Sequence, residues 1–223
     1  MWTLRLSQLR RRAFLLGGFG LAARRQALLS LPISLEISLD PARWQIGPII
    51  RGKNYSPGMP SQPTAEGTGW SFSFPAQDGV HYITTPLTGS VIGRRAVKAR
   101  FAFTGPGRLV PTQGDPPALI RLFLQRRGDD WSGAGVHEYY RWWSVGHVEL
   151  TEGEHELVAP LVPNQWLSVF GKRGDQFGAA EQFTAAMADL QAVGLTFGGT
   201  FAGHGVFAVE GPARFTLMSF QIV

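Results

Sequence analysis

The segment AVKARFAFTG, residues 96–105, alternates between apolar residues and charged or small ones. Successive side chains of a β-strand point to opposite faces, so a strand here would gather its large apolar side chains on one face. That face holds Val97, Ala99, Phe101 and Phe103, and the opposite face holds Lys98 and Arg100. Because only one face is apolar, the segment predicts a strand of an antiparallel sheet that buries one side and leaves the other in water.

The same two-residue period recurs along the chain. In GWSFSFP, residues 69–75, Trp70, Phe72 and Phe74 alternate with serines, which places three aromatic rings on one face. The 28 glycines and 15 prolines fall between such short apolar runs, as expected of strands joined by turns. About nine or ten strands are predicted, from segments at 69–75, 79–86, 96–105, 118–127, 136–144, 147–152, 155–161, 192–199, 204–211 and 213–223.

Only the segment AAEQFTAAMADL, residues 179–190, favours a helix. Phe183, Met187 and Leu190 recur there at helical spacing and would form its buried stripe. Many short strands and one small helix predict an all-β fold, a two-sheet antiparallel jelly-roll sandwich with one short helix over residues 69–223. The turn-rich residues 28–68 are expected to form an irregular wrapping segment.

The charge of the chain is concentrated at its N-terminus. Of the 21 lysines and arginines, six lie in residues 1–27, which contain no carboxylate; the rest of the chain holds 15 basic and 16 acidic residues, a balance of −1. A phosphate backbone requires a basic face, so we expect no nucleic-acid partner. The absence of cysteine excludes disulfides, thiol catalysis and cysteine-ligated zinc.

Residues 9–23, LRRRAFLLGGFGLAA, place a basic region before about eleven weakly apolar residues, too few to cross the ~30 Å hydrocarbon core of a bilayer. We therefore expect no stable membrane span. The run Arg11-Arg12-Ala13-Phe14-Leu15 resembles a twin-arginine export signal, which implies an exported, periplasmic or extracellular protein. The alternative is that residues 1–27 are retained as an arm that docks on a partner.

The C-terminal part adds a second resemblance. QWLSVFG at 165–171 is followed by the helical segment, by a strand and by a closing strand at 213–223. This order resembles the galactose-binding-like jelly rolls found in many bacterial carbohydrate-binding modules, over roughly residues 70–223. The resemblance implies a glycan ligand held by aromatic, arginine and histidine side chains. Met218 and Ser219 stand where such modules often carry an aspartate, so no structural calcium is expected.

The segment VHEYYRWWS, residues 136–144, is the candidate binding strand. Alternation would put His137, Tyr139, Arg141 and Trp143 on one face, where rings can stack on sugar C–H surfaces and polar groups can bind hydroxyls. The outward face of residues 118–127 would lie beside it, with a further tryptophan at the rim of the connecting loop. The predicted ligand-binding residues are therefore Arg121, Gln125, Trp131, His137, Tyr139, Arg141 and Trp143.

Other interpretations of these residues remain open. The rings and arginines can stack on one another without any ligand, or can form an interface with a protein partner. A structural or assembly protein is thus one alternative to carbohydrate or surface-polymer binding. A polysaccharide lyase is another, with His137, Tyr139 and Arg141 as base, proton donor and charge-neutralising group. We expect binding without catalysis, no cofactor and no metal, because no histidine pair has zinc spacing and the adjacent aspartates Asp129 and Asp130 are typical of a polar turn.

Overall fold

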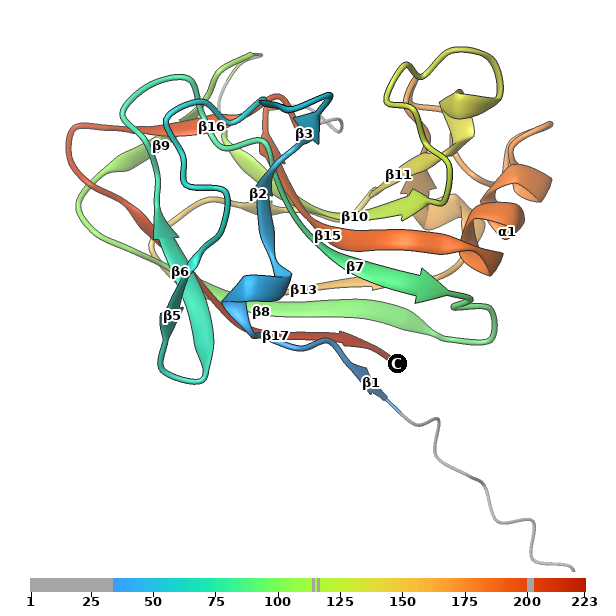
Figure 1. The fold of residues 1–223 in the computed structure, drawn as a ribbon, viewed down its shortest axis with the longest axis horizontal. Coiled ribbons are helices and arrows are strands. Elements are labelled where there is room, and N and C mark those ends of the chain that lie inside the picture. Colours follow the sequence, from blue (N-terminus) through green and yellow to red (C-terminus); the bar gives the residue numbers. More distant parts are fainter. Residues whose placement is uncertain (1–33, 114, 116, 200–202) are drawn as a thin grey trace, which may run out of the picture. The chain divides into compact units, whose positions relative to one another are not determined.

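The computed structural model describes residues 34–113, 115, 117–199 and 203–223. The predicted export signal at 1–27 lies outside the described residues. Two antiparallel sheets enclose one hydrophobic core, and in Figure 1 strands β10, β15 and β7 of one sheet lie above β13, β8 and β17 of the other.

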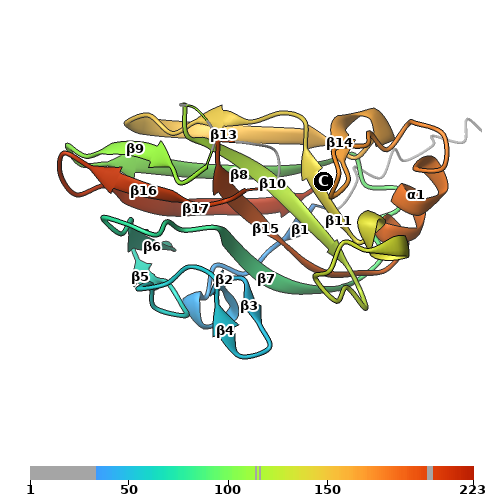
Figure 2. The ribbon, with the colours of Figure 1, turned by 90° about the horizontal axis from the view of Figure 1, so that it is seen from above.

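The six-stranded sheet has the order β13-β8-β17-β6-β5, and β1 pairs with the end of β17. Its strands are β1 (Leu35–Glu36), β5 (Thr64–Glu66), β6 (Gly69–Ser73), β8 (Ala96–Thr104), β13 (Gly153–Pro160) and β17 (Arg214–Ile222). The long strand β17 pairs with β8 along its length, and its other edge pairs first with β6 and then, at its end, with β1 (Figure 2).

The seven-stranded sheet has the order β14-β11-β10-β15-β7-β2, and β12 pairs with β10. Its strands are β2 (Gln45–Gly47), β7 (Tyr82–Gly89), β10 (Leu119–Arg126), β11 (Arg141–Ser144), β12 (Val148–Glu149), β14 (Trp166–Leu167) and β15 (Leu190–Gly198). Consecutive strands repeatedly cross from one sheet to the other. This crossing pattern confirms the predicted two-sheet antiparallel sandwich.

The remaining elements are short. Two small ladders pair β3 (Ile49–Ile50) with β4 (Lys53–Asn54) and β9 (Arg108–Pro111) with β16 (Val206–Val209). The helices of the described residues are α1 (Ala180–Ala188) and the 3-10 turns η1 (Pro41–Arg43), η2 (Gly135–Tyr139) and η3 (Pro163–Gln165). As predicted, Phe183, Met187 and Leu190 are buried, although Leu190 already begins β15.

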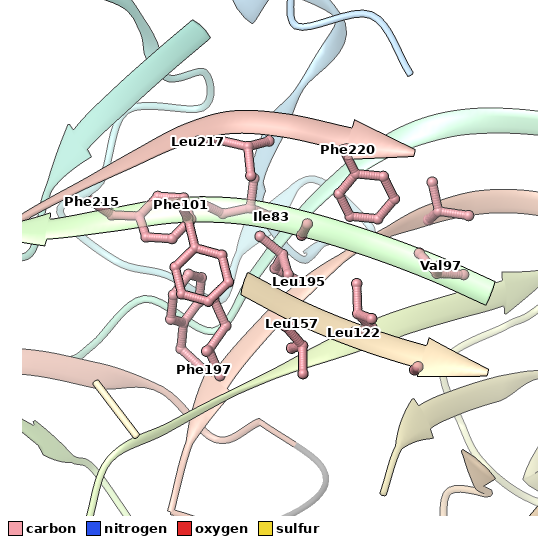
Figure 3. Packing of buried hydrophobic residues seen from close by; sticks show 14 of the residues in the cluster. Ile83, Val97, Phe101, Leu122, Leu157, Leu195, Phe197, Phe215, Leu217 and Phe220 are labelled. Atoms are coloured by element: carbon pink, nitrogen blue, oxygen red, sulfur yellow. The ribbon is translucent and has the colours of Figure 1, made fainter. Parts of the chain in front are cut away.

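The alternation of the sequence determines which side chains form the core. All four apolar residues predicted on one face of β8 are buried, whereas Arg100 is exposed. Phe215 of β17 is fully buried, and its ring centroid lies 5.6 Å from that of Phe101 in β8 and 5.5 Å from that of Phe197 in β15. Figure 3 shows these rings and the aliphatic side chains around them between the two sheets.

The segment expected to be irregular contributes more to the sandwich than its composition indicates. Within residues 34–68 the structure contains β1 to β5, and β2 pairs with β7 at the edge of the seven-stranded sheet. Trp44 is buried, with its ring 4.9 Å from that of Trp70 and 5.6 Å from that of Phe220. These strands span only two or three residues, which is too short to show a period in the sequence.

The prediction of one continuous strand over 136–144 is wrong. Only Arg141–Ser144 are extended, as β11, while Gly135–Tyr139 form the 3-10 turn η2. Gly133 and Gly135 have φ angles of 69° and 57°, a left-handed conformation that glycine adopts without strain and that interrupts an extended chain. His137 and Tyr139 therefore do not share a strand face with Arg141 and Trp143.

We expect Phe215→Ala to lower the free energy of unfolding by about 3–5 kcal/mol, because it leaves a cavity between the two sheets. Chemical denaturation of the purified chain measures this change. Phe177→Ala is the matched control, because the Phe177 side chain is 99% exposed and the same truncation should cost less than about 0.5 kcal/mol. Equal effects of the two changes would contradict the assignment of Phe215 to the core.

Candidate functional site

The outward face of the seven-stranded sheet is covered at one end by its own aromatic residues. Cross-strand register aligns Phe123 of β10 with Trp143 of β11 and with Gly194 of β15. Phe123, Trp143 and Tyr82 of β7 form a second apolar cluster, separate from the core, and each is at most 7% exposed. Trp143 therefore does not present its ring to solvent, contrary to the expected open face.

Trp131, in the loop after β10, covers this cluster. Its ring meets Tyr82 edge-on at 5.6 Å and lies nearly parallel to Phe123 at 6.4 Å. The backbone at Trp131 has a φ of 67°, an uncommon conformation for a residue with a large side chain. The ring is only partly buried, so one part of it packs on the cluster and another part remains accessible.

A buried ion pair fixes the loop beneath Trp131. The Asp129 carboxylate is fully buried; its Oδ2 lies 3.1 Å from Arg141 Nε and accepts a 2.8 Å hydrogen bond from Gln125 Nε2. Its Oδ1 accepts a hydrogen bond from the Trp131 backbone N–H. The Arg141 guanidinium lies 5.0 Å from the centre of the Trp131 ring, in a cation–π arrangement. Gln125 and Arg141 are directly paired across β10 and β11, which are antiparallel neighbours as expected from the sequence.

A groove of about 590 Å³ crosses the same sheet beside this loop. We call it the Trp131 groove; its principal lining residues are Arg43, Gln45, Thr84, Gln125, Trp131 and Gln191. Its floor is formed by the outward residues of β7, β15 and β10. In Figure 1 the strand β3 and the yellow loop that follows β10 both rise above these strands.

Two of the seven predicted residues, Gln125 and Trp131, line the groove, and Arg141 supports it from below. Arg121 lies elsewhere on the same sheet face, nine-tenths buried, and its guanidinium donates to the backbone carbonyls of Ser144 and Val145. Burial lowers the pKa of Arg121. Its role in the structure is to tie β10 to the end of β11.

His137 and Tyr139 lie on η2, outside the groove lining. His137 Nδ1 is 3.4 Å from the Asp130 carboxylate, and the Tyr139 hydroxyl accepts a 3.1 Å hydrogen bond from Lys172 Nζ. The partners of His137, Tyr139 and Arg141 are thus different: Asp130, Lys172 and Asp129, respectively.

Ligand atoms of Asp129, Asp130 and His137 lie within 4.8 Å of one another, a spacing that admits a metal ion. However, the Asp129 charge is already neutralised by Arg141, and Asp130 Oδ1 accepts hydrogen bonds from the Ser132 backbone N–H and hydroxyl. A cation here would face the positive charge of Arg141 and would have to compete with these partners. The three side chains thus form ion pairs and hydrogen bonds with neighbouring residues of the loop and of β11.

Sequence reasoning missed the wall of the groove formed by Arg43, Gln45 and Gln62, because all three lie in the segment expected to be irregular. The one local sequence signal was the apolar–polar–apolar run Trp44-Gln45-Ile46. In the structure Trp44 and Ile46 are buried and Gln45 is exposed. Gln191 was missed for a different reason, since it lies at the junction between α1 and β15, where the helical and strand periods meet.

No family model and no curated protein matches this chain. Among solved structures, a mutant of Xylanase10C from Cellvibrio japonicus in complex with xylopentaose has a TM-score of 0.48 and 14% identity, and the match covers 85% of this chain and 28% of that one. A mutant of LamA from Z. galactanivorans in complex with laminaritriose and laminaritetraose has a TM-score of 0.43 and 10% identity over 85% and 97% of the two chains. CtCBM11 has a TM-score of 0.35 and 12% identity, and the match covers 72% of this chain and 79% of that one.

The described residues contain no helix with the length and apolar character that a membrane span requires.

We expect Asp129→Ala to lower the free energy of unfolding by about 3–5 kcal/mol, since it leaves the buried Arg141 guanidinium without its counter-charge. Asp175→Ala is the control, because Asp175 pairs with Arg173 at the surface and its loss should cost less than about 1 kcal/mol. Thermal and denaturant unfolding of both variants measure the difference. A loss for Asp129→Ala no larger than that of the control would show that the pair does not hold the loop.

Proposed function

We propose that this chain is a non-catalytic domain that binds carbohydrate, or a surface polymer of similar chemistry, in the Trp131 groove. The observation that carries the proposal is the combination of one accessible indole with several amide and hydroxyl side chains along a single groove on the sheet. This proposal moves the predicted site from the residues of the 136–144 segment to the neighbouring part of the same sheet face.

The chemistry of the lining suits a sugar. A pyranose ring presents apolar C–H surfaces and a ring of hydroxyls, so its site pairs a flat aromatic surface with groups that both donate and accept hydrogen bonds. Trp131 provides the aromatic surface. The amides of Gln45, Gln62 and Gln191 and the hydroxyl of Thr84 provide donors and acceptors, and all of them line the groove.

The groove is also largely preformed. Binding costs free energy whenever side chains or loops must be ordered, so a site held in place by its own contacts binds more tightly. Here the Asp129–Arg141 pair and the ring contacts with Tyr82 and Phe123 already fix the position of Trp131. The floor consists of hydrogen-bonded strands of one sheet.

A second candidate function is docking on a protein partner in an assembly. Val136, Phe170 and Phe177 are 61%, 70% and 99% exposed, and Phe177 in particular has almost no contact within the chain. The segment of Phe170 runs beside η2, since Val169 N–H donates to the Glu138 carbonyl. A contiguous exposed apolar patch is typical of an interaction surface, and Phe170 and Val136 lie on these neighbouring segments.

We also propose that the chain is exported through its twin-arginine-like segment. Fusion of residues 1–27 to a reporter should deliver the reporter across the membrane, and replacing both Arg11 and Arg12 by lysine should abolish delivery. A conservative change of Arg24 and Arg25 to lysine is the control and should leave delivery intact. Delivery that survives the first change would favour a retained arm.

Binding of the full chain to a glycan array tests the proposed function. We expect Trp131→Ala to weaken binding about tenfold or more, because it removes the stacking surface. Gln45→Ala keeps the packing of the loop intact and should weaken binding by a smaller factor. Phe177→Ala, a truncation of an exposed ring outside the groove, should leave glycan binding unchanged.

Bound glycan that neither Trp131→Ala nor Gln45→Ala affects would show that the groove is not the site. Failure of the folded chain to bind any glycan would favour the assembly interpretation. In that case Phe170→Ala and Phe177→Ala should alter the oligomeric state or the capture of a partner.

A further inference from the structure

The charge of the Trp131 groove differs from that of the rest of the domain. Outside residues 1–27 the chain carries 16 acidic and 15 basic residues, so its charges nearly balance. The residues that line the groove nevertheless include Arg43 and Arg127 and no aspartate or glutamate. Cationic side chains without a carboxylate in the lining favour an anionic ligand.

Arg43 is the stronger of the two cationic positions. Among the residues that the structure describes, its exposed side chain has no hydrogen bond and no carboxylate within ion-pair distance. Its backbone is nevertheless held in place, because Asp40 Oδ1 accepts a hydrogen bond from Ala42 N–H and Gln62 Nε2 donates to the Ala42 carbonyl. Within the described part of the chain, the Arg43 guanidinium is therefore unpaired and stands on a fixed turn at the edge of the groove.

Arg127 lines the groove from the β10 side. Its Nε donates to Asp189 Oδ1 at 3.1 Å, and both side chains of this pair are about half exposed. A guanidinium has five N–H donors, so those of the two terminal nitrogens remain for a ligand. Arg43 precedes β2 and Arg127 follows β10, and these strands are three positions apart in the sheet, roughly 14 Å at a spacing of about 4.8 Å.

We infer that the Trp131 groove binds an anionic oligosaccharide, with a carboxylate or sulfate group of the chain held by Arg43. The planar guanidinium forms two parallel hydrogen bonds with either group, which gives orientation as well as attraction. Arg127 contributes to the binding of a second anionic unit, and Trp131 stacks on a sugar ring of the same oligosaccharide. This inference rests on the proposed function and specifies the class of glycan that the site prefers.

Two matched pairs of probes test the inference with the full chain. One pair is oligogalacturonate and the same oligosaccharide after reduction of its carboxyl groups, and the other is a carrageenan oligosaccharide before and after removal of its sulfates. Titration calorimetry measures the affinity for each. We expect at least one anionic probe to bind about tenfold more tightly than its neutral partner, with a preference that decreases at high salt.

Arg43→Gln should reduce this preference about tenfold while leaving the affinity for the neutral partner unchanged. Arg95→Gln is the matched control: it removes the same charge from another exposed arginine outside the groove and should keep the preference. Arg127→Gln should reduce the preference by a smaller factor.

The preferred pair identifies the anionic group as carboxylate or sulfate. Equal or tighter binding of the neutral probes, sensitive to Trp131→Ala, would overturn the inference and leave the proposed function standing. An anionic preference that Arg43→Gln and Arg95→Gln reduce equally would also overturn it, since net charge alone would then explain the effect. Absence of binding to all four probes and to the glycan array would overturn the proposed function itself.

Discussion

Burial of the Asp129 carboxylate beside Arg141 is the constraint on which the geometry of the Trp131 groove depends. Transfer of two charges from water costs several kcal/mol per ion, and the cost is offset here by the mutual attraction and by hydrogen bonds from Gln125 and from the Trp131 backbone. The left-handed backbone at Trp131 adds a further cost on the order of 1–2 kcal/mol. A residue keeps such a backbone conformation only where the surrounding structure holds it there. Here the buried Asp129–Arg141 pair holds the backbone of Trp131.

At one end of the seven-stranded sheet, the Trp131 loop forms a third layer outside the two sheets. At the other end, the described residues form no such layer of aromatic side chains on the outward face of the sheet. Where Tyr82, Phe123 and Trp143 point outward, the loop of Trp131 covers them, and burial raises the pKa of the Tyr82 phenol so that it stays neutral. Where the outward residues are Thr84 and Ala192, they line the open groove. The boundary between the two regions is Trp131, which belongs to both.

The sequence was most informative where strands are long. The eight or nine residues of β8 and β10 provide enough alternating positions to separate the core face from the outward face. The expected antiparallel pairing of segments 118–127 and 136–144 made β10 and β11 neighbours, but their register, with Gln125 opposite Arg141, was not predicted. The strand prediction failed over 136–140 because it used only the alternation of side chains. The left-handed φ angles of Gly133 and Gly135 interrupt an extended backbone there. The groove could not be predicted, since its two walls are separated by about 80 residues and one of them consists of elements too short to have a period.

The aromatic and arginine residues had two interpretations, mutual packing and ligand binding. Each interpretation applies to different residues among the seven predicted to bind a ligand. Packing accounts for Trp143, Arg121 and Arg141, which are buried and have partners within the chain. Trp131 is the member of the set that stays accessible in the groove, and the proposed binding role falls to it, whereas Gln125 lines the groove but is 4% exposed and donates to Asp129. The two roles are physically linked, because an exposed indole becomes a rigid recognition surface only when the layer beneath it fixes its position. Changes in the buried layer should therefore reduce stability and binding together, whereas changes at exposed groove residues such as Gln45 and Arg43 should affect binding alone.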